Sequence, residues 1–165
     1  MAIATGPIDD PTHAATIEIG APPQKLWEMV AEVTRTPEWS PACYRTEWIG
    51  DPAEPFPGAR FRGYNRLNGA RWSRECVVTE ADAGRVFAFS TIFKGAESTR
   101  WRYSFHETDT ATTVTEAYQV VRAPLWLRLL WLVPGARAKS ERDTRWNIST
   151  TLERLKTVAE RSTPS

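Results

Sequence analysis

The stretch from Ala59 to Glu80 reads ARFRGYNRLNGARWSRECVVTE and decides the fold class of this chain. Large apolar residues alternate with polar ones on both sides of Asn68-Gly69, which is the pattern of two half-buried strands. Asn and Gly both tolerate a positive φ, so this pair predicts a tight turn. The stretch therefore predicts an antiparallel hairpin of two strands, residues 59–67 and 71–80.

Strand patterns continue on both sides of this hairpin. Turn-forming residues, rich in Gly, Pro, Asp and Asn, separate one strand from the next. The further predicted strands are residues 15–19, 44–49, 85–93, 98–106 and 112–121. About seven short strands at regular spacing indicate an antiparallel sheet.

Two short helices are predicted after the first strand, and one long helix is predicted at the end of the chain. Residues 23–33 carry apolar side chains at helical spacing, and the Pro-rich segment 36–41 favours a short helical turn. Residues 137–161 place Ile148 and Leu152 on one apolar stripe. Only this long helix is large enough to cover the apolar face of the sheet. The order predicts an α+β helix-grip fold, in which a curved antiparallel sheet wraps a long C-terminal helix.

Composition narrows the class of protein. A chain of 165 residues predicts one domain, over residues 14–161, with loose termini at 1–13 and 162–165. Its 21 basic and 20 acidic residues nearly cancel, so we expect no nucleic-acid partner.

The cysteines and histidines are few and scattered. Cys43 and Cys76 lie outside any CxxC motif, and no His cluster accompanies them, so we expect no metal site. The sequence also lacks the Gly-rich motifs that bind common cofactors, so no cofactor is expected. Residues 1–11 lack the basic and apolar regions of a signal peptide, which predicts a cytoplasmic protein with reduced thiols.

Several short motifs, taken in order, resemble those of one known family. They are Ile17-Glu18-Ile19-Gly20-Ala21-Pro22 before Leu26-Trp27, then Pro37-Glu38-Trp39-Ser40-Pro41, Gly58-Ala59-Arg60-Phe61, Trp101 to Phe105, Thr113-Val114-Thr115-Glu116, and Thr151-Leu152-Glu153-Arg154-Leu155-Lys156. In this order and spacing, over residues 14–161, the chain resembles the START/Bet v 1-like (SRPBCC) superfamily, in its bacterial polyketide cyclase/dehydrase-like branch. The resemblance implies a helix-grip fold with a cavity between the sheet and the C-terminal helix. It implies no shared catalytic motif, because similar proteins include lipid carriers, aromatic polyketide cyclases and co-chaperone-like domains.

Strand alternation predicts which side chains face the interior. The more apolar face of each strand should point to the helix, and eight tryptophans make this interior bulky. The residues predicted to contact a small, largely apolar ligand, lipid or polyketide-like, are Phe61, Asn65, Trp72, Arg74, Phe89, Trp101, Tyr103, Glu116 and Tyr118. The alternative is that the aromatic side chains fill the interior completely.

The same alternation points three polar side chains inward. An unpaired charge in a dry interior is costly, so Arg74 and Glu116 should pair, or the cavity should hold water, or a ligand should supply their polar contacts. Together with Asn65 they form a predicted polar patch. The alternative is a strand bulge that returns one of them to solvent.

The predicted polar patch and the neighbouring Tyr118 are the residues for which the sequence suggests a catalytic role. A cyclase or dehydratase needs a proton donor or acceptor and a group that stabilises an enolate. Glu116 is the candidate acid/base, and Arg74 or Tyr118 would stabilise negative charge. Binding of an apolar ligand is therefore the first hypothesis, a polyketide cyclase/dehydratase-like enzyme the second, and a co-chaperone-like interaction domain the third.

The segment Leu125–Val133 is apolar except for Arg128. As a helix it would span about 14 Å, which is too short to cross a membrane. We expect it to close the pocket or to form a dimer contact. The alternative is a pocket mouth that touches a membrane surface or a partner, because exposed apolar patches usually mark contacts.

Overall fold

Seven antiparallel strands form one sheet in the computed structural model, which describes residues 3–52, 54–123 and 125–161. The strand order is β1-β7-β6-β5-β4-β3-β2, so strands β2 to β7 follow chain order across the sheet and β1 pairs with β7. The strands are β1 (His13–Ile19), β2 (Cys43–Ile49), β3 (Arg60–Leu67), β4 (Ala70–Asp82), β5 (Val86–Phe93), β6 (Ala96–Glu107) and β7 (Thr112–Val120). The predicted antiparallel sheet is confirmed.

The hairpin of β3 and β4 turns at Asn68-Gly69, as its sequence predicts. Asn68 has a φ of 50° and Gly69 a φ of 81°. Positive φ at both central residues is what the tightest hairpin turns require. The turn aligns Asn65 with Trp72 and Gly63 with Arg74 across the pair. Asn65, Trp72 and Arg74 therefore share the inner face of the sheet.

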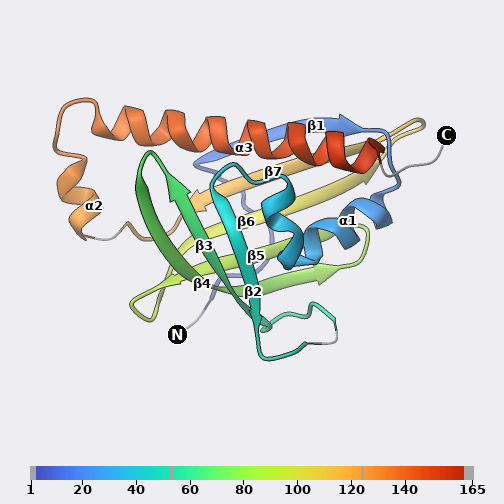
Figure 1. The fold of residues 1–165 in the computed structure, drawn as a ribbon, viewed down its shortest axis with the longest axis horizontal. Helices are drawn as coiled ribbons and strands as arrows, with labels where there is room; N and C mark the ends of the chain where they lie inside the picture. Colours follow the sequence, from blue (N-terminus) through green and yellow to red (C-terminus); the bar gives the residue numbers. More distant parts are fainter. Residues whose placement is uncertain (1–2, 53, 124, 162–165) are drawn as a thin grey trace.

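The helices are α1 (Pro23–Ala31), the 3-10 helix η1 (Val33–Glu38), α2 (Leu125–Leu130) and α3 (Ala136–Arg161). The long helix α3 runs across the concave side of the sheet (Figure 1). Register shifts between Val78 and Glu80 and between Thr91 and Ile92 interrupt the pairing of β5 with its two neighbours. Such bulges bend strands and increase their twist, which lets the sheet curve around the helix. The helix-grip fold is confirmed.

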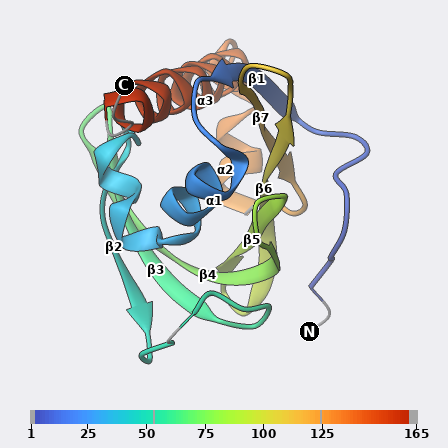
Figure 2. The same cartoon turned by 90° about the vertical axis from the view of Figure 1, so that its right-hand side faces the viewer.

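The helices α1 and α2 lie at opposite ends of the long helix. Figure 1 shows α2 beside the start of α3, whereas α1 lies near its end, and Figure 2 views the molecule from the α1 end. Trp27 on α1 donates a hydrogen bond from Nε1 to the carbonyl oxygen of Val86 at 2.8 Å. Trp39 follows η1 and is 1% exposed. These two tryptophans fix the short helices against the sheet.

The packed core lies between α1, the C-terminal half of α3 and the sheet. On α3 the buried side chains are Ile148, Thr151, Leu152, Leu155 and Ala159, at the spacing of one helix face. Two further contacts hold the end of α3 to β1 and the turn after it. Lys156 donates to the carbonyl oxygen of Glu18 at 2.9 Å, and Glu160 accepts from the Gly20 amide at 2.9 Å.

The chain before β1 lies against the outer face of the sheet. The amide of Gly6 donates to Glu80 at 3.1 Å, and Arg100 donates to the Gly6 carbonyl oxygen at 2.8 Å. The first strand begins at His13, slightly earlier than predicted. The predicted loose tail 162–165 lies outside the described residues.

Candidate functional site

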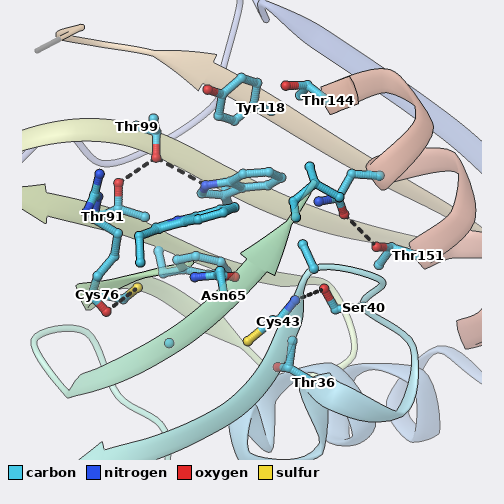
Figure 3. A pocket seen from close by; sticks show the side chains of 18 of the residues that line it. Thr36, Ser40, Cys43, Asn65, Cys76, Thr91, Thr99, Tyr118, Thr144 and Thr151 are labelled. Carbon is cyan, nitrogen blue, oxygen red and sulfur yellow. Dashed lines mark hydrogen bonds between the residues drawn. The ribbon is translucent and has the colours of Figure 1, made fainter. Parts of the chain in front are cut away.

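A cavity of about 630 Å³ lies between the concave face of the sheet and the N-terminal half of α3. Pockets that bind small molecules commonly have volumes of about 300–1,000 Å³. Figure 3 shows side chains of several strands on one side of the space and Thr144 and Thr151 of α3 on the other. The aromatic side chains therefore do not fill the interior, which was the alternative left open by the sequence.

A row of aromatic rings crosses the sheet and forms the apolar wall of the cavity. Phe61 meets Phe89 edge to face at 5.2 Å between centroids, and Phe89 stacks with Trp101 at 6.3 Å. Trp101 then packs against Tyr118 at 4.5 Å. The four residues belong to β3, β5, β6 and β7. Their rings present a continuous apolar surface to the cavity.

Hydrogen bonds fix the largest ring of this row. Trp101 Nε1 donates to the Thr99 hydroxyl at 3.1 Å, and that hydroxyl lies 2.6 Å from the Thr91 hydroxyl (Figure 3). A buried indole N–H normally requires such a partner. Burial raises the pKa of Tyr118 to about 12, so this phenol stays neutral at physiological pH. The wall therefore presents neutral rings in defined orientations.

Glu116 is the buried acid of the site. It is 2% exposed, and its Oε1 accepts a hydrogen bond of 2.7 Å from the Tyr103 hydroxyl. Tyr103 and Glu116 are paired residues on β6 and β7, so strand register brings them together. Burial raises the pKa of Glu116 to about 8, and the Tyr103 hydrogen bond opposes that rise only in part. At neutral pH the carboxyl group is therefore mainly protonated and can donate a hydrogen bond.

Two residues that line the cavity each carry a buried polar atom with no hydrogen-bond partner among the described residues. The two atoms are Glu116 Oε2 and Trp131 Nε1. Buried polar atoms without partners cost about 1–3 kcal/mol each, and they commonly mark sites that a water molecule or ligand completes. A water molecule or ligand oxygen that reached these atoms would supply the missing hydrogen bonds.

Of the three alternatives for Arg74 and Glu116, direct pairing is the one that the structure contradicts. Within the described residues no hydrogen bond or ion pair joins them; Arg74 donates to the Ser73 carbonyl oxygen at 2.9 Å, and its guanidinium lies 4.8 Å from the centroid of Phe93. Arg74 is on β4 and Glu116 on β7, with β5 and β6 between them. Strands lie about 4.8 Å apart, so side chains three strands apart do not meet on an open face. The polar patch is divided into Asn65 and Arg74 on one side of the cavity and Glu116 on the other.

The N-terminal half of α3 supplies a polar face that the sequence analysis missed. This face consists of Lys139, Ser140, Asp143, Thr144 and Asn147, all of which line the cavity. The signal was present in the helical spacing, because these positions continue the stripe of Ile148 and Leu152 toward the N-terminus. Polar residues at stripe positions indicate that the helix is not packed there.

One opening of the cavity lies beside α2. The lining residues Leu130 and Lys139 are both exposed, and Trp131 is partly buried with its ring 5.8 Å from the Arg137 guanidinium. These exposed lining residues place an opening of the cavity at the α2 end. Of the segment Leu125–Val133, Leu130 and Trp131 line the cavity, and whether the segment closes the pocket stays a prediction.

All nine residues that the sequence pointed toward the helix line the cavity, from Phe61 to Tyr118. Strand alternation is the reason, since each strand keeps one face inward. That they bind a ligand stays a prediction. Cys43 and Cys76 also line the cavity as free thiols, and burial raises the pKa of both. Low-reactivity thiols of this kind act as small apolar side chains.

A family model described as polyketide cyclase/dehydrase and lipid transport matches residues 11–160. The chain belongs to this family. The resemblance noted in the sequence is thereby confirmed. No protein of curated function matches the chain.

Several solved structures share this fold. The Polyketide_cyc-like protein Cgl2372 from Corynebacterium glutamicum is 28% identical, with 90% of each chain covered and a TM-score of 0.58. The ZhuI aromatase/cyclase from Streptomyces sp. R1128 is 17% identical, over 90% of this chain and 93% of that one, with a TM-score of 0.66. A START superfamily protein from Mycobacterium smegmatis is 16% identical, over 92% and 98% of the chains, with a TM-score of 0.68. At identities of 16–17%, the likeness shows the fold alone.

The described residues contain neither a metal-binding group nor a membrane-spanning helix. Among the described residues, His, Cys, Asp and Glu side chains form no group of three or more that would hold a metal ion. In the same part of the chain, every helix is too short or too polar to span a bilayer.

Proposed function

We propose that the protein binds a small, largely apolar ligand, lipid or polyketide-like, between the sheet and α3. The cavity of about 630 Å³ carries this proposal. Its volume fits a molecule of drug or fatty-acid size, and its wall of Phe61, Phe89, Trp101 and Tyr118 favours an apolar body. Membership of a polyketide cyclase/dehydrase and lipid transport family supports the same class of ligand.

The unpartnered polar atoms define where the ligand should carry oxygen. Trp131 Nε1 is a donor only, so it requires an acceptor at the α2 end of the cavity. Protonated Glu116 can donate from Oε2 to a carbonyl or hydroxyl oxygen. We therefore expect an apolar molecule with a few separated oxygen atoms, and not a plain hydrocarbon.

Native mass spectrometry of freshly purified protein tests the binding function. We expect a bound mass beyond that of the chain, which disappears when the protein is denatured and is recovered by organic extraction. Added 1-anilinonaphthalene-8-sulfonate should also bind with a stoichiometry near one per chain. A protein that is empty by mass and does not bind this dye would contradict the proposal.

A second candidate function is a cyclase/dehydratase-like reaction with Glu116 as acid/base. The observation that favours it is a buried acid with a pKa of about 8 whose Oε2 has no partner in the described residues. Enzymes use carboxyl groups raised toward neutral pH to move protons next to a carbonyl group. Protonated Glu116 would stabilise an enolate oxygen, and the ionised form would remove a proton from the adjacent carbon.

Glu116→Gln separates the two functions, because Gln is similar in shape and cannot titrate. A β-diketone thioester would serve as the reactive probe. If the protein is an enzyme, the variant binds the probe but loses at least about 100-fold in turnover. Unchanged turnover would exclude Glu116 as the acid/base. The third hypothesis, a co-chaperone-like interaction domain, would require a filled interior. The cavity of about 630 Å³ disagrees with that requirement.

A further inference from the structure

Exposed apolar side chains gather on α2 and the turn that follows it. Leu132 is 78% exposed, Leu125 69%, Leu129 56%, Val133 54% and Leu130 48%. These five residues, here called the α2 patch, are half of the large exposed apolar residues in the described chain. Contiguous patches of this kind usually mark a contact surface.

The α2 patch has little support from the rest of the domain. Figure 1 shows α2 standing at the end of α3, beyond the edge of the sheet. The core lies at the other end of α3, around Ile148, Leu152 and Leu155. The five side chains of the α2 patch lie outside that core.

The charged residues of the chain segment that carries the patch are all basic. Between Glu116 and Glu141 the sequence holds four basic residues and no acidic one: Arg122, Arg128, Arg137 and Lys139. Arg137 and Lys139 pair with Glu141 and Asp143 on α3. Arg122 and Arg128 are exposed and form no ion pair within the described residues. The whole chain carries a net charge of only +1, so this segment is a local concentration of positive charge.

We propose that the α2 patch docks the protein on an anionic lipid bilayer. The leucines would enter the interface, and Arg122 and Arg128 would contact lipid phosphates, which is the arrangement of interfacial amphipathic helices. A second copy of the chain fits less well. A twofold contact through the same patch would bring the arginines of both copies together without a carboxylate in the segment to neutralise them.

Docking in this way would place the opening of the cavity at the membrane. Leu130 belongs to the patch and also lines the cavity, and the next residue, Trp131, lines it as well. A ligand dissolved in the bilayer would then enter without crossing water. This consequence rests on the proposed ligand-binding function, whereas docking itself requires only the patch.

Vesicle flotation tests the docking. Wild-type protein should float with vesicles of phosphatidylcholine and phosphatidylglycerol, bind pure phosphatidylcholine vesicles weakly, and lose binding as salt is raised. The double variant Leu129→Ser/Leu132→Ser should bind at least about tenfold more weakly, because two exposed leucines no longer enter the interface. Arg128→Glu should lower binding to the anionic vesicles only.

Phe56→Ser is the matched control, since Phe56 is 53% exposed and lies far along the chain in another loop. It should bind like wild type. Failure of the wild type to float, or an unchanged double variant, would overturn the proposal. So would a dimer in light scattering that Leu129→Ser/Leu132→Ser dissociates, because the patch would then be an interface between copies.

A measurement of ligand occupancy distinguishes membrane docking from the proposed ligand-binding function. Native mass spectrometry of the double variant, refolded and loaded with oleic acid, reports on the cavity alone. Loss of flotation with retained loading supports docking through the patch. Flotation of a protein that never binds a ligand would contradict the proposed function and leave the docking supported.

Discussion

The two halves of α3 belong to one helix but face different surroundings. The C-terminal half, residues 148–161, buries Ile148, Leu152 and Leu155 against the sheet and α1. The N-terminal half, residues 136–147, presents Ser140, Thr144 and other polar side chains to the cavity. A helix thus contributes to the core only as far as its apolar stripe extends, and beyond that point the same helix covers an open space.

The largest expected effect concerns Glu116, on the cavity side of this division. Its pKa of about 8 in the folded protein exceeds the ordinary value of 4.5, so the folded state binds the proton more tightly than the unfolded state. The free energy of unfolding should therefore fall as pH rises from about 4.5 to 8, by on the order of 4 kcal/mol in total. Glu116→Gln should remove this loss.

Urea unfolding at pH 5 and pH 9 measures the effect of Glu116→Gln. The variant should gain stability over wild type at pH 9 and little or nothing at pH 5. Glu97→Gln provides a comparison outside the cavity, because Glu97 accepts hydrogen bonds from the Ser90 hydroxyl and the Ala4 amide. Equal pH profiles for wild type and Glu116→Gln would show that Glu116 titrates as an exposed acid.

Leu152→Ala tests the packed half of α3. Leu152 is 2% exposed within the core, so its truncation should lower the free energy of unfolding by about 3 kcal/mol. Thr144→Ala, two turns earlier and facing the cavity, should change stability by less than about 1 kcal/mol. Equal losses in urea unfolding would remove the distinction between the two halves.

Thr144→Trp tests the N-terminal half of α3 by adding side-chain volume instead of removing it. A large side chain at Thr144 has room to enter the cavity, so stability should be nearly unchanged. The affinity for 1-anilinonaphthalene-8-sulfonate should fall by about tenfold or more, since the ring would occupy part of the ligand space. A fluorescence titration measures this, and Trp146→Ser, on an exposed side chain of the same helix, serves as the control.

The smallest effect is expected at the contact between the β3–β4 hairpin and α3. Asn68 Nδ2 donates to Asp143 Oδ2 at 3.2 Å, and Lys139 lies 2.9 Å from the same oxygen. Because these groups are largely exposed, Asp143→Ala should cost less than about 1 kcal/mol in urea unfolding. A larger loss would show that the hairpin contact holds the open half of α3 in place.

The strands and their inward faces were predictable because both depend on local pattern. Asn68-Gly69 specifies its turn by backbone preference, and alternation then assigns Trp72, Arg74 and their neighbours to one face. The nine residues predicted to contact a ligand were selected by the same alternation. The alternative in which Arg74 pairs with Glu116 was wrong, because facing inward does not make two side chains neighbours.

Only the tertiary structure decided which inward side chains meet and how much space they leave. Tyr103 rather than Arg74 contacts Glu116, because the register of β6 with β7 and the order of the strands set the distances. The cavity depends on the curvature of the sheet, the position of α3 and the size of side chains from distant parts of the chain. Sequence pattern determines local geometry and faces, whereas volumes and partners arise from the sum of long-range packing.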